Sequence, residues 1–388
     1  MIVGVAREAN QHERRVALVP AAVPTLAKAR LEVLIEKGAG EAAGYPDASY
    51  EQQGARLASG REEVFASAEI LVTLGSLGGQ AELLRSGQFL LGLLNPLGAP
   101  APVGEWARKG VTAFALEFLP RITRAQPMDA LTSMATVAGY KAALLGASTL
   151  QKMYPMMITA AGTITPARVF VIGAGVAGLQ AIATSRRLGA VVHAYDVRPA
   201  VKEQVESLGA KFLELGLETK EAEAAGGYAR EMSAEFYQRQ QEMMAKAVAE
   251  SDVVITTAAV PGKRAPILIP EEAVRRMRPG SVVIDLAAET GGNCALTRPG
   301  ETHQADGVTV LGPTNLPATV PFHASQMYAR NITAFLQNLV VKGELRLNLD
   351  DPILRDTLLT HQGEVVNTRV REALGLPAAS GAPNQGGN

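Results

Sequence analysis

Three glycines, Gly173, Gly175 and Gly178, stand at a spacing that can hold a phosphate group. The stretch Arg168–Ile172 before them is rich in β-branched residues and predicts a buried strand, and residues 179–188 after them predict a helix. Glycines between a strand and a helix allow a tight turn and bring the backbone close to a pyrophosphate, which the N–H groups of the helix start bind. The pattern predicts a dinucleotide site whose contacts include Gly173, Gly175, Ala177 and Gly178.

A carboxylate follows at the distance that such a site requires. Residues 190–195 predict a second strand, and Asp196 comes directly after it, about 20 residues beyond the glycines. A carboxylate at this place accepts a hydrogen bond from the ribose 2′-OH and repels a 2′-phosphate, which favours NAD over NADP. Arg198 is the complication, because an arginine nearby can accommodate a 2′-phosphate.

A second group of polar residues occupies positions 121–132, before and at the start of a predicted helix. Helix capping explains Asp129 and Thr132, but it does not explain two arginines and a glutamine. We interpret the group as one that holds the carboxamide and ribose of a nicotinamide, at the mouth of a cleft between two domains. Its members are Arg121, Arg124, Gln126, Asp129 and Thr132.

The sequence gives little support for a metal site or for nucleophilic catalysis. The histidines include no pair with metal-ligand spacing, so we predict no metal site. His193 lies within a predicted strand and is interpreted as a packed residue, and His323 is assigned to a helix cap or the core. No nucleophile motif supports a Ser/His/Asp site. The remaining histidines are His12, His303 and His361.

Composition sets further bounds. A chain of 388 residues is long enough for two domains, and 37 basic against 38 acidic residues predict no nucleic-acid partner. The single Cys294 excludes a disulfide framework. The charge-free run 169–185 approaches the length of a membrane span, but its glycines and its change from strand to helix favour a buried βα unit. With no signal peptide before the predicted strand at 2–6, we expect a cytoplasmic protein.

The remaining elements must position these residues. The N-terminal third alternates apolar runs of strand length with helical stretches, which predicts a doubly wound parallel sheet. A helix at 130–153 is expected to connect two domains, and a second at 321–341 to return to the first. The predicted fold class is therefore α/β, with two doubly wound parallel-sheet domains joined by long helices. We predict an N-terminal domain at 1–130 completed by 315–376, a dinucleotide-binding domain at 131–314 and a flexible tail at 377–388.

The connection 216–251 between the third and fourth predicted strands of the dinucleotide-binding domain is far longer than a helical crossover requires. Residues 233–249 have helical character, whereas the segment 216–232 has little to bury. It leaves from the carboxyl end of a strand, where ligands of these sheets bind, so one interpretation is a lid anchored by Tyr228. The alternative is a solvated surface loop, and the sequence leaves both open.

Several longer stretches resemble one family, and together they cover nearly the whole chain. They are RITRAQPMDALTSMATVAGYKA, MMITAAGTITPARVFVIGAGVAGLQAIATSRRLGA, VRPAVKEQVESLGAKF, AGGYAREM and VIDLAAETGGNC. They resemble the NAD(H)-binding component of proton-translocating nicotinamide nucleotide transhydrogenases. The chain is similar, more distantly, to alanine dehydrogenases, which share an early Arg-Val such as Arg15-Val16. The resemblance implies a Rossmann domain that binds NAD(H) and a second, flavodoxin-like or alanine-dehydrogenase-like domain.

The resemblance also implies particular site residues. The family's arginine, glutamine, aspartate and hydroxyl set falls on positions 121, 126, 129 and 132, where threonine here replaces the usual serine. It assigns the mobile-loop tyrosine to Tyr228. The implied cofactor contacts are Val176, Asp196, Val197, Arg198, Gly227, Gln240 and Ala259.

The activity implied by the resemblance is hydride transfer between NADH and NADP⁺. The NADP(H) would be bound by a partner beta subunit, and separate membrane-spanning subunits would couple the transfer to proton translocation. The resemblance further implies a homodimer associated with the inner face of the cell membrane.

Two other functions compete with this one. An alanine dehydrogenase has a substrate lysine and a catalytic histidine, and the corresponding stretches 72–76 and 92–96 contain neither. Hydride transfer between two nicotinamide rings needs no acid or base, so the protein supplies position and excludes water. A non-catalytic NAD-binding module fits the glycines but leaves the polar group at 121–132 unexplained.

Overall fold

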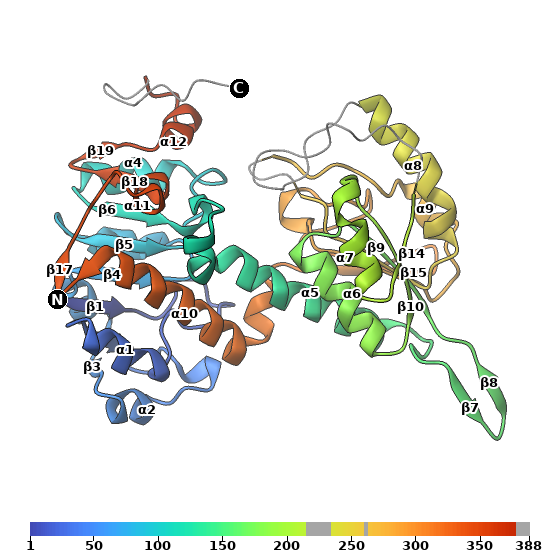
Figure 1. Ribbon diagram of the computed structural model, residues 1–388, viewed down its shortest axis with the longest axis horizontal. Coiled ribbons are helices and arrows are strands. Elements are labelled where there is room, and N and C mark those ends of the chain that lie inside the picture. The colour runs from blue at the N-terminus through green and yellow to red at the C-terminus, as the bar shows by residue number, and fades with distance from the viewer. Residues whose placement is uncertain (215–233, 260–262, 378–388) are drawn as a thin grey trace. The chain divides into compact units, whose positions relative to one another are not determined.

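The computed structural model describes residues 1–214, 234–259 and 263–377. The chain divides into two compact units (Figure 1): unit 1 comprises Met1–Met134 with Ala318–Asn388, and unit 2 comprises Ala135–Pro317. The first boundary falls within helix α5 (Ala130–Thr149), and the second within the short helix η8 (Leu316–Thr319). The segment 216–232, with Gly227 and Tyr228, lies outside the described residues, so both of its interpretations stay open.

Unit 1 is built on an eight-stranded sheet, ordered β19-β18-β6-β5-β4-β1-β2-β3. The strands from β3 to β6 run parallel, and β18 and β19 are added antiparallel at the β6 edge. The strands are β1 (Ile2–Val5), β2 (Glu32–Glu36), β3 (Arg56–Ala58), β4 (Ile70–Thr73), β5 (Phe89–Gly92), β6 (Thr112–Ala115), β18 (Leu358–His361) and β19 (Glu364–Val365).

Helices cover both faces of this sheet, which explains why its central strands are largely apolar. On one face Phe65 of α3 and Trp106 of α4 share a buried cluster with Ala113 of β6. On the other face Phe335 of α10 meets Phe114 of β6 edge-on, with ring centroids 5.5 Å apart. The helices of unit 1 are α1 (Val23–Lys28), α2 (Asp47–Gln52), α3 (Arg61–Ser67), α4 (Ala101–Arg108), α10 (Pro321–Leu339), α11 (Pro352–Thr357) and α12 (Thr368–Ala373).

Unit 2 is built on a seven-stranded sheet, ordered β11-β10-β9-β12-β13-β15-β14. Its strands run parallel from β11 to β15, and β14 is added antiparallel at the edge. The strands are β9 (Arg168–Ile172), β10 (Val191–Tyr195), β11 (Lys211–Phe212), β12 (Val253–Thr256), β13 (Val282–Asp285), β14 (Thr302–Ala305) and β15 (Val308–Leu311). The helices are α6 (Val176–Arg187), α7 (Lys202–Ser207), α8 (Ala234–Ala249) and α9 (Glu271–Arg275), with the larger part of α5.

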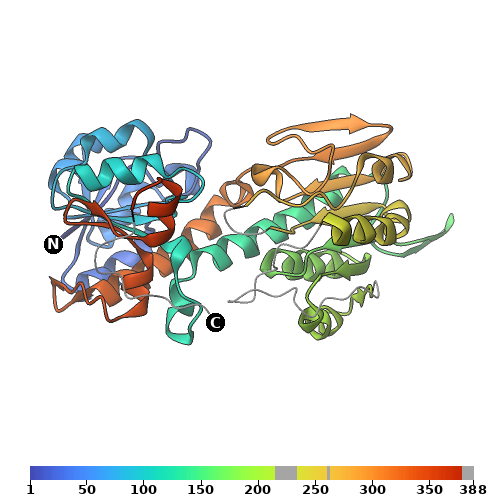
Figure 2. The ribbon, with the colours of Figure 1, turned by 90° about the horizontal axis from the view of Figure 1, so that it is seen from above.

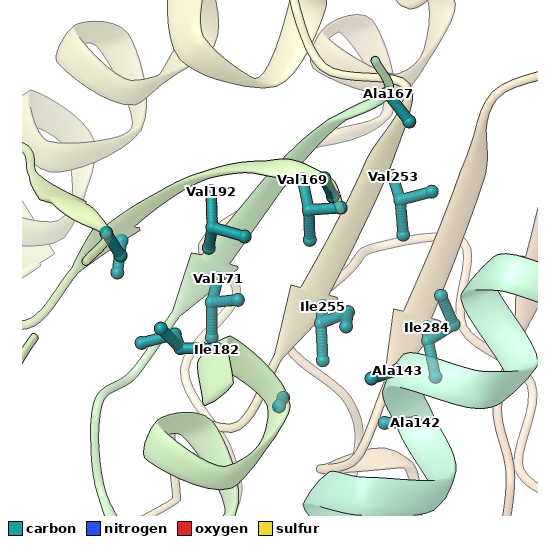
Figure 3. Packing of buried hydrophobic residues seen from close by; sticks show 14 of the residues in the cluster. Ala142, Ala143, Ala167, Val169, Val171, Ile182, Val192, Val253, Ile255 and Ile284 are labelled. Carbon is teal, nitrogen blue, oxygen red and sulfur yellow. The ribbon is translucent and has the colours of Figure 1, made fainter. Parts of the chain in front are cut away.

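The two faces of this second sheet are covered by different helices, as the ribbon seen from above also shows (Figure 2). Val169 and Val171 of β9 pack in one buried cluster with α5, α6 and α7, and the alternate residues Phe170 and Ile172 pack in another with α8 and α9. Figure 3 shows Ala142 and Ala143 of α5 beside Ile284 of β13, where small side chains let the helix lie close to the sheet.

When only the parallel strands of each sheet are numbered, in chain order, both sheets have the order 3-2-1-4-5-6. This is the order of the dinucleotide-binding fold, whereas flavodoxin has 2-1-3-4-5. The prediction of an α/β fold with two doubly wound parallel sheets is confirmed, and within that class unit 1 has the dinucleotide-binding order.

Two short hairpins complete the described structure. β16 (Val340–Val341) pairs with β17 (Glu344–Leu345), and β7 (Met157–Thr159) pairs with β8 (Gly162–Ile164) outside either large sheet. The second hairpin exposes apolar side chains, with Met156 60 % and Ile158 81 % exposed. Within the described ranges no helix has the length and apolar character needed to span a membrane.

Candidate nucleotide-binding site

The glycine loop of unit 2 joins the end of β9 to the start of α6, as its spacing predicts. Gly173 has φ +94°, and a Cβ there would lie 2.6 Å from Thr257 Oγ1. A Cβ on Gly178 would lie 1.9 Å from the carbonyl oxygen of Gly173, so only glycine permits this approach of helix and loop. Gly175 precedes the first turn of α6, and no side chain caps that turn. The first-turn N–H groups of α6, from Val176 to Gly178, are therefore suited to an anion.

Asp196 follows β10 and ties the glycine loop to Arg198. One carboxylate oxygen accepts hydrogen bonds from the Ala174 N–H (2.7 Å) and from Nη2 of Arg198 (2.8 Å). The other accepts from the backbone N–H (2.8 Å) and Nε (2.9 Å) of Arg198. The side chains of the pair are only 4 % and 13 % exposed. The guanidinium that a 2′-phosphate would need is therefore already engaged by Asp196.

The end of β12 lies against the same loop. Thr257 donates from Oγ1 to the Gly173 carbonyl (2.9 Å), and its N–H donates to the Ile172 carbonyl (2.8 Å). β9 and β12 are neighbours whose connections leave on opposite sides of the sheet, so the crevice between their ends is where ligands of such sheets bind. Ala259, the predicted contact two residues further on, is exposed.

Gln240 of α8, another of the predicted contacts, is only 2 % exposed. Its Nε2 donates to the Tyr195 hydroxyl (2.8 Å), and its Oε1 is buried with no hydrogen-bond partner among the residues that the structure describes. Burial raises the pKa of Tyr195 to about 12. Gln240 thus stabilises the position of Tyr195 at the end of β10, next to Asp196. Val197, by contrast, is half-buried.

The polar group at 121–132 belongs to unit 1 and separates into two kinds of residue. Asp129 caps α5, because its carboxylate accepts from the Thr132 N–H (2.8 Å) and from the Thr132 hydroxyl (2.6 Å). Arg121 and Gln126 are exposed. The short helix η5 (Thr123–Met128), which carries Gln126, is held to α10, where Asn331 donates to the Pro127 carbonyl (2.8 Å).

Arg124 has a partner that the sequence does not suggest. Its guanidinium forms a two-pronged ion pair with Asp351, and Nη1 also donates to Asn338 Oδ1 (3.2 Å). The Asp351 hydrogen bond raises the pKa of Arg124. In the structure Arg124 thus ties η5 to the C-terminal segment, while its predicted contact with a cofactor stays a prediction.

Two buried residues near the glycine loop were not predicted from the sequence. Asp285, at the end of β13, and Asn293 are both 0 % exposed and fully hydrogen-bonded. They belong to the stretch VIDLAAETGGNC, and a charged residue ending a fully apolar strand was the available signal. As far as the structure describes the chain, no three histidine, cysteine or acidic side chains gather as a metal site.

A doubly wound sheet with a glycine loop after its first strand and a carboxylate after its second defines a dinucleotide-binding protein. The chain belongs to the alanine dehydrogenase/PNT family, because the family's N-terminal domain matches residues 4–138 and its C-terminal domain matches residues 142–368. The family predicted from the sequence motifs is confirmed, and with this membership unit 2 is a nicotinamide-nucleotide-binding unit.

The chain is similar to named relatives along almost its full length. It is 44 % identical to an NAD(P) transhydrogenase alpha-subunit chain of Rhodospirillum rubrum, over 95 % of this chain and 98 % of that one. The crystal structure of a transhydrogenase from Sinorhizobium meliloti superposes with a TM-score of 0.83 and 39 % identity, over 95 % and 99 % of the two chains. The structure of an L-alanine dehydrogenase superposes with a TM-score of 0.80 and 28 % sequence identity, over 97 % of this chain and 99 % of that one.

Proposed function

We propose that this chain is the NAD(H)-binding component of an NAD(P) transhydrogenase. The observation that carries the proposal is the glycine loop of unit 2, with its uncapped helix start and with Arg198 held by Asp196. The first feature suits a pyrophosphate, and the second favours a free ribose 2′-OH over a 2′-phosphate. Full-length similarity to transhydrogenase alpha chains supports the same activity.

The reaction moves a hydride from C4 of the dihydronicotinamide of NADH to C4 of the nicotinamide of NADP⁺, leaving NAD⁺ and NADPH. No proton is exchanged with the protein, so the residues need only bind, orient and exclude water. We assign the dinucleotide grip to the loop of unit 2 and the orientation of the reacting ring to Arg121, Gln126, Asp129 and Thr132 of unit 1. The exposed side chains of Arg121 and Gln126 support this assignment.

The partner of the reaction is an NADP(H)-binding beta subunit, and membrane-spanning subunits couple the transfer to proton translocation. In such an assembly the chain works at the cytoplasmic face of the cell membrane. We also propose a homodimer, which the β7–β8 hairpin supports because its exposed Met156, Met157 and Ile158 are an apolar surface suited to burial. Light scattering should reveal a dimer that Ile158→Asp weakens.

The activity is tested with the purified chain, NADH and an NADP analogue, with and without an NADP-binding partner. Hydride transfer should require the partner. Arg121→Ala or Gln126→Ala should slow hydride transfer roughly a hundredfold, while NADH affinity falls much less. The reason is that a misplaced nicotinamide ring lowers the rate of transfer more than it lowers the affinity. Arg56→Ala, an exposed arginine paired with Glu32 in unit 1, is the control. Oxidation of alanine by the isolated chain would instead assign it to the alanine dehydrogenases.

A further inference from the structure

Asp285 is a buried residue that holds the loops at the carboxyl ends of the strands in unit 2. It ends β13 opposite Thr256 of β12, and its carboxylate accepts from the Thr256 hydroxyl (2.8 Å). It also accepts from the backbone N–H groups of Ala287 (3.0 Å), Asn293 (2.7 Å) and Cys294 (2.9 Å), and from the Thr297 hydroxyl. A buried charge needs such a set of donors, and here they fix the position of the loop that carries Asn293.

The side chain of Asn293 in turn holds the backbone that follows β12. Its Oδ1 accepts from the Ala258 N–H (3.0 Å), and its Nδ2 donates to the carbonyls of Ala258 (2.8 Å) and Pro266 (2.9 Å). One amide therefore holds both backbone groups of Ala258 and joins them to Pro266. No other side chain of this size offers an acceptor and two donors in this arrangement.

Ala258 is directly linked to the glycine loop. Its neighbour Thr257 donates to the Gly173 carbonyl, and a Cβ on Gly173 would lie 3.1 Å from the Ala258 nitrogen. A continuous series of contacts thus runs from Asp285 through Asn293 and the end of β12 to the loop predicted to bind the pyrophosphate. Every member of the series lies within unit 2.

We propose that Asn293 is a positioning residue for the dinucleotide: it fixes the backbone of Ala258 against the glycine loop, so that the crevice between β9 and β12 is preformed. The inference rests on the proposed function, since the ligand is NAD(H). Asn293 acts through Ala258 and Thr257 and does not itself touch the nucleotide. Loss of the Asn293 side chain would leave the fold intact but would make the crevice less ordered. NAD(H) binding would then have to order the crevice, and this cost would lower the affinity.

The test compares Asn293→Ser with Ser251→Ala. Asn293→Ser removes the contacts with Ala258, whereas Ser251→Ala removes a buried hydrogen bond to the Ala247 carbonyl elsewhere in unit 2 and leaves the series from Asp285 to Ala258 untouched. NADH fluorescence titration should show about a tenfold weaker affinity for Asn293→Ser, and less than about a twofold change for Ser251→Ala, even where both lower Tm equally. Hydrogen exchange of the Ala258 amide should speed up in the first variant alone.

A second variant covers the case in which Asn293→Ser fails to fold. Thr257→Val keeps the shape of the side chain but breaks the contact with Gly173, and it should weaken NADH binding severalfold. Wild-type affinity in whichever of Asn293→Ser and Thr257→Val folds would overturn the inference while leaving the proposed function standing. Failure of the wild-type chain to bind NADH would instead overturn the proposed function.

Discussion

Both units offer a crevice at the same place in the same topology, and they use it in opposite ways. In unit 2 the crevice between β9 and β12 is lined by glycine backbone. In unit 1 the equivalent place between β1 and β4 is occupied by Glu8, whose carboxylate accepts from the Thr73 hydroxyl (2.9 Å) and the Leu74 N–H (2.8 Å). The Glu8 carboxylate thus accepts the hydrogen bonds that these donors could otherwise give to a ligand. Strand order provides the crevice, and the residues after the strands decide what fills it.

The two units also differ in how carboxyl groups at the carboxyl ends of their strands are hydrogen-bonded. Asp285 accepts from five donors, and Asp196 from four. Glu8 has two donors, and burial raises its pKa to about 7 despite them. Burial likewise raises the pKa of Glu117, after β6, to about 7. Unit 2 therefore surrounds its carboxylates with donors at this end, whereas unit 1 holds carboxyl groups that titrate near neutral pH.

The largest expected effect comes from adding a methyl group in unit 2. Gly178→Ala puts a Cβ against the Gly173 carbonyl and must displace the loop, so NADH affinity should fall roughly a hundredfold in a fluorescence titration. Gly75→Ala is the matched change in unit 1, where a Cβ after β4 meets nothing within 4 Å. Equal losses in the two variants would show that the units do not differ in the way described.

An intermediate effect should follow from removing the charge of Asp196. Asp196→Asn frees Arg198 from its ion pair, so NADPH should bind about tenfold more tightly and NADH more weakly. Both affinities are measured by titration, with Asp306→Asn as an exposed control in the same unit. An unchanged preference for NADH would mean that Arg198 does not reach the ribose.

The smallest effect concerns the titrating carboxyl of unit 1. Because the folded-state pKa of Glu8 is about 7 and its ordinary value is 4.5, the stability linked to it is fully present below pH 4.5 and is lost as pH rises through 7. Glu8→Gln should therefore raise Tm at pH 8 by roughly 2–4 °C and change it little at pH 4.5. Scanning calorimetry at the two pH values tests this.

Glu63→Gln is the control for that experiment. Glu63 is only half-buried, and hydrogen bonds from Ser59 lower its pKa, so its substitution should not produce a gain at pH 8. A Glu8→Gln variant that gains nothing at pH 8 would contradict the assignment of a neutral-range pKa to Glu8.

Much of the fold follows from the sequence, because buried parallel strands are continuous apolar runs and the glycine loop has a fixed spacing. The starts of α5 at Ala130 and α10 at Pro321 are as predicted. Strands that carry polar residues were missed: Arg56–Ala58 and Thr302–Ala305 lie at sheet edges, where one side is solvated. Their patterns lack the apolar signal on which strand prediction depends.

The site was predictable where its chemistry is local and not where it depends on distant partners. The capping pair Asp129 and Thr132 is three residues apart, so spacing alone suggests it. Arg124, however, pairs with Asp351, 227 positions along the chain, and nothing near Arg124 indicates this. Asn293 shows the same limit, because its contacts with Ala258 arise only when β12 and β13 lie side by side.

The insertion of unit 2 into unit 1 has a consequence for how the chain folds as it leaves the ribosome. All the strands of unit 2 have been made by Leu311, whereas unit 1 still lacks α10, β18 and β19. Until Phe335 emerges, Phe114 lacks the ring that packs on it from α10, and the half-built first sheet presents an apolar face. Although its first residues are made earliest, unit 1 must therefore finish folding last, and its open face is the point at which a chaperone is most needed.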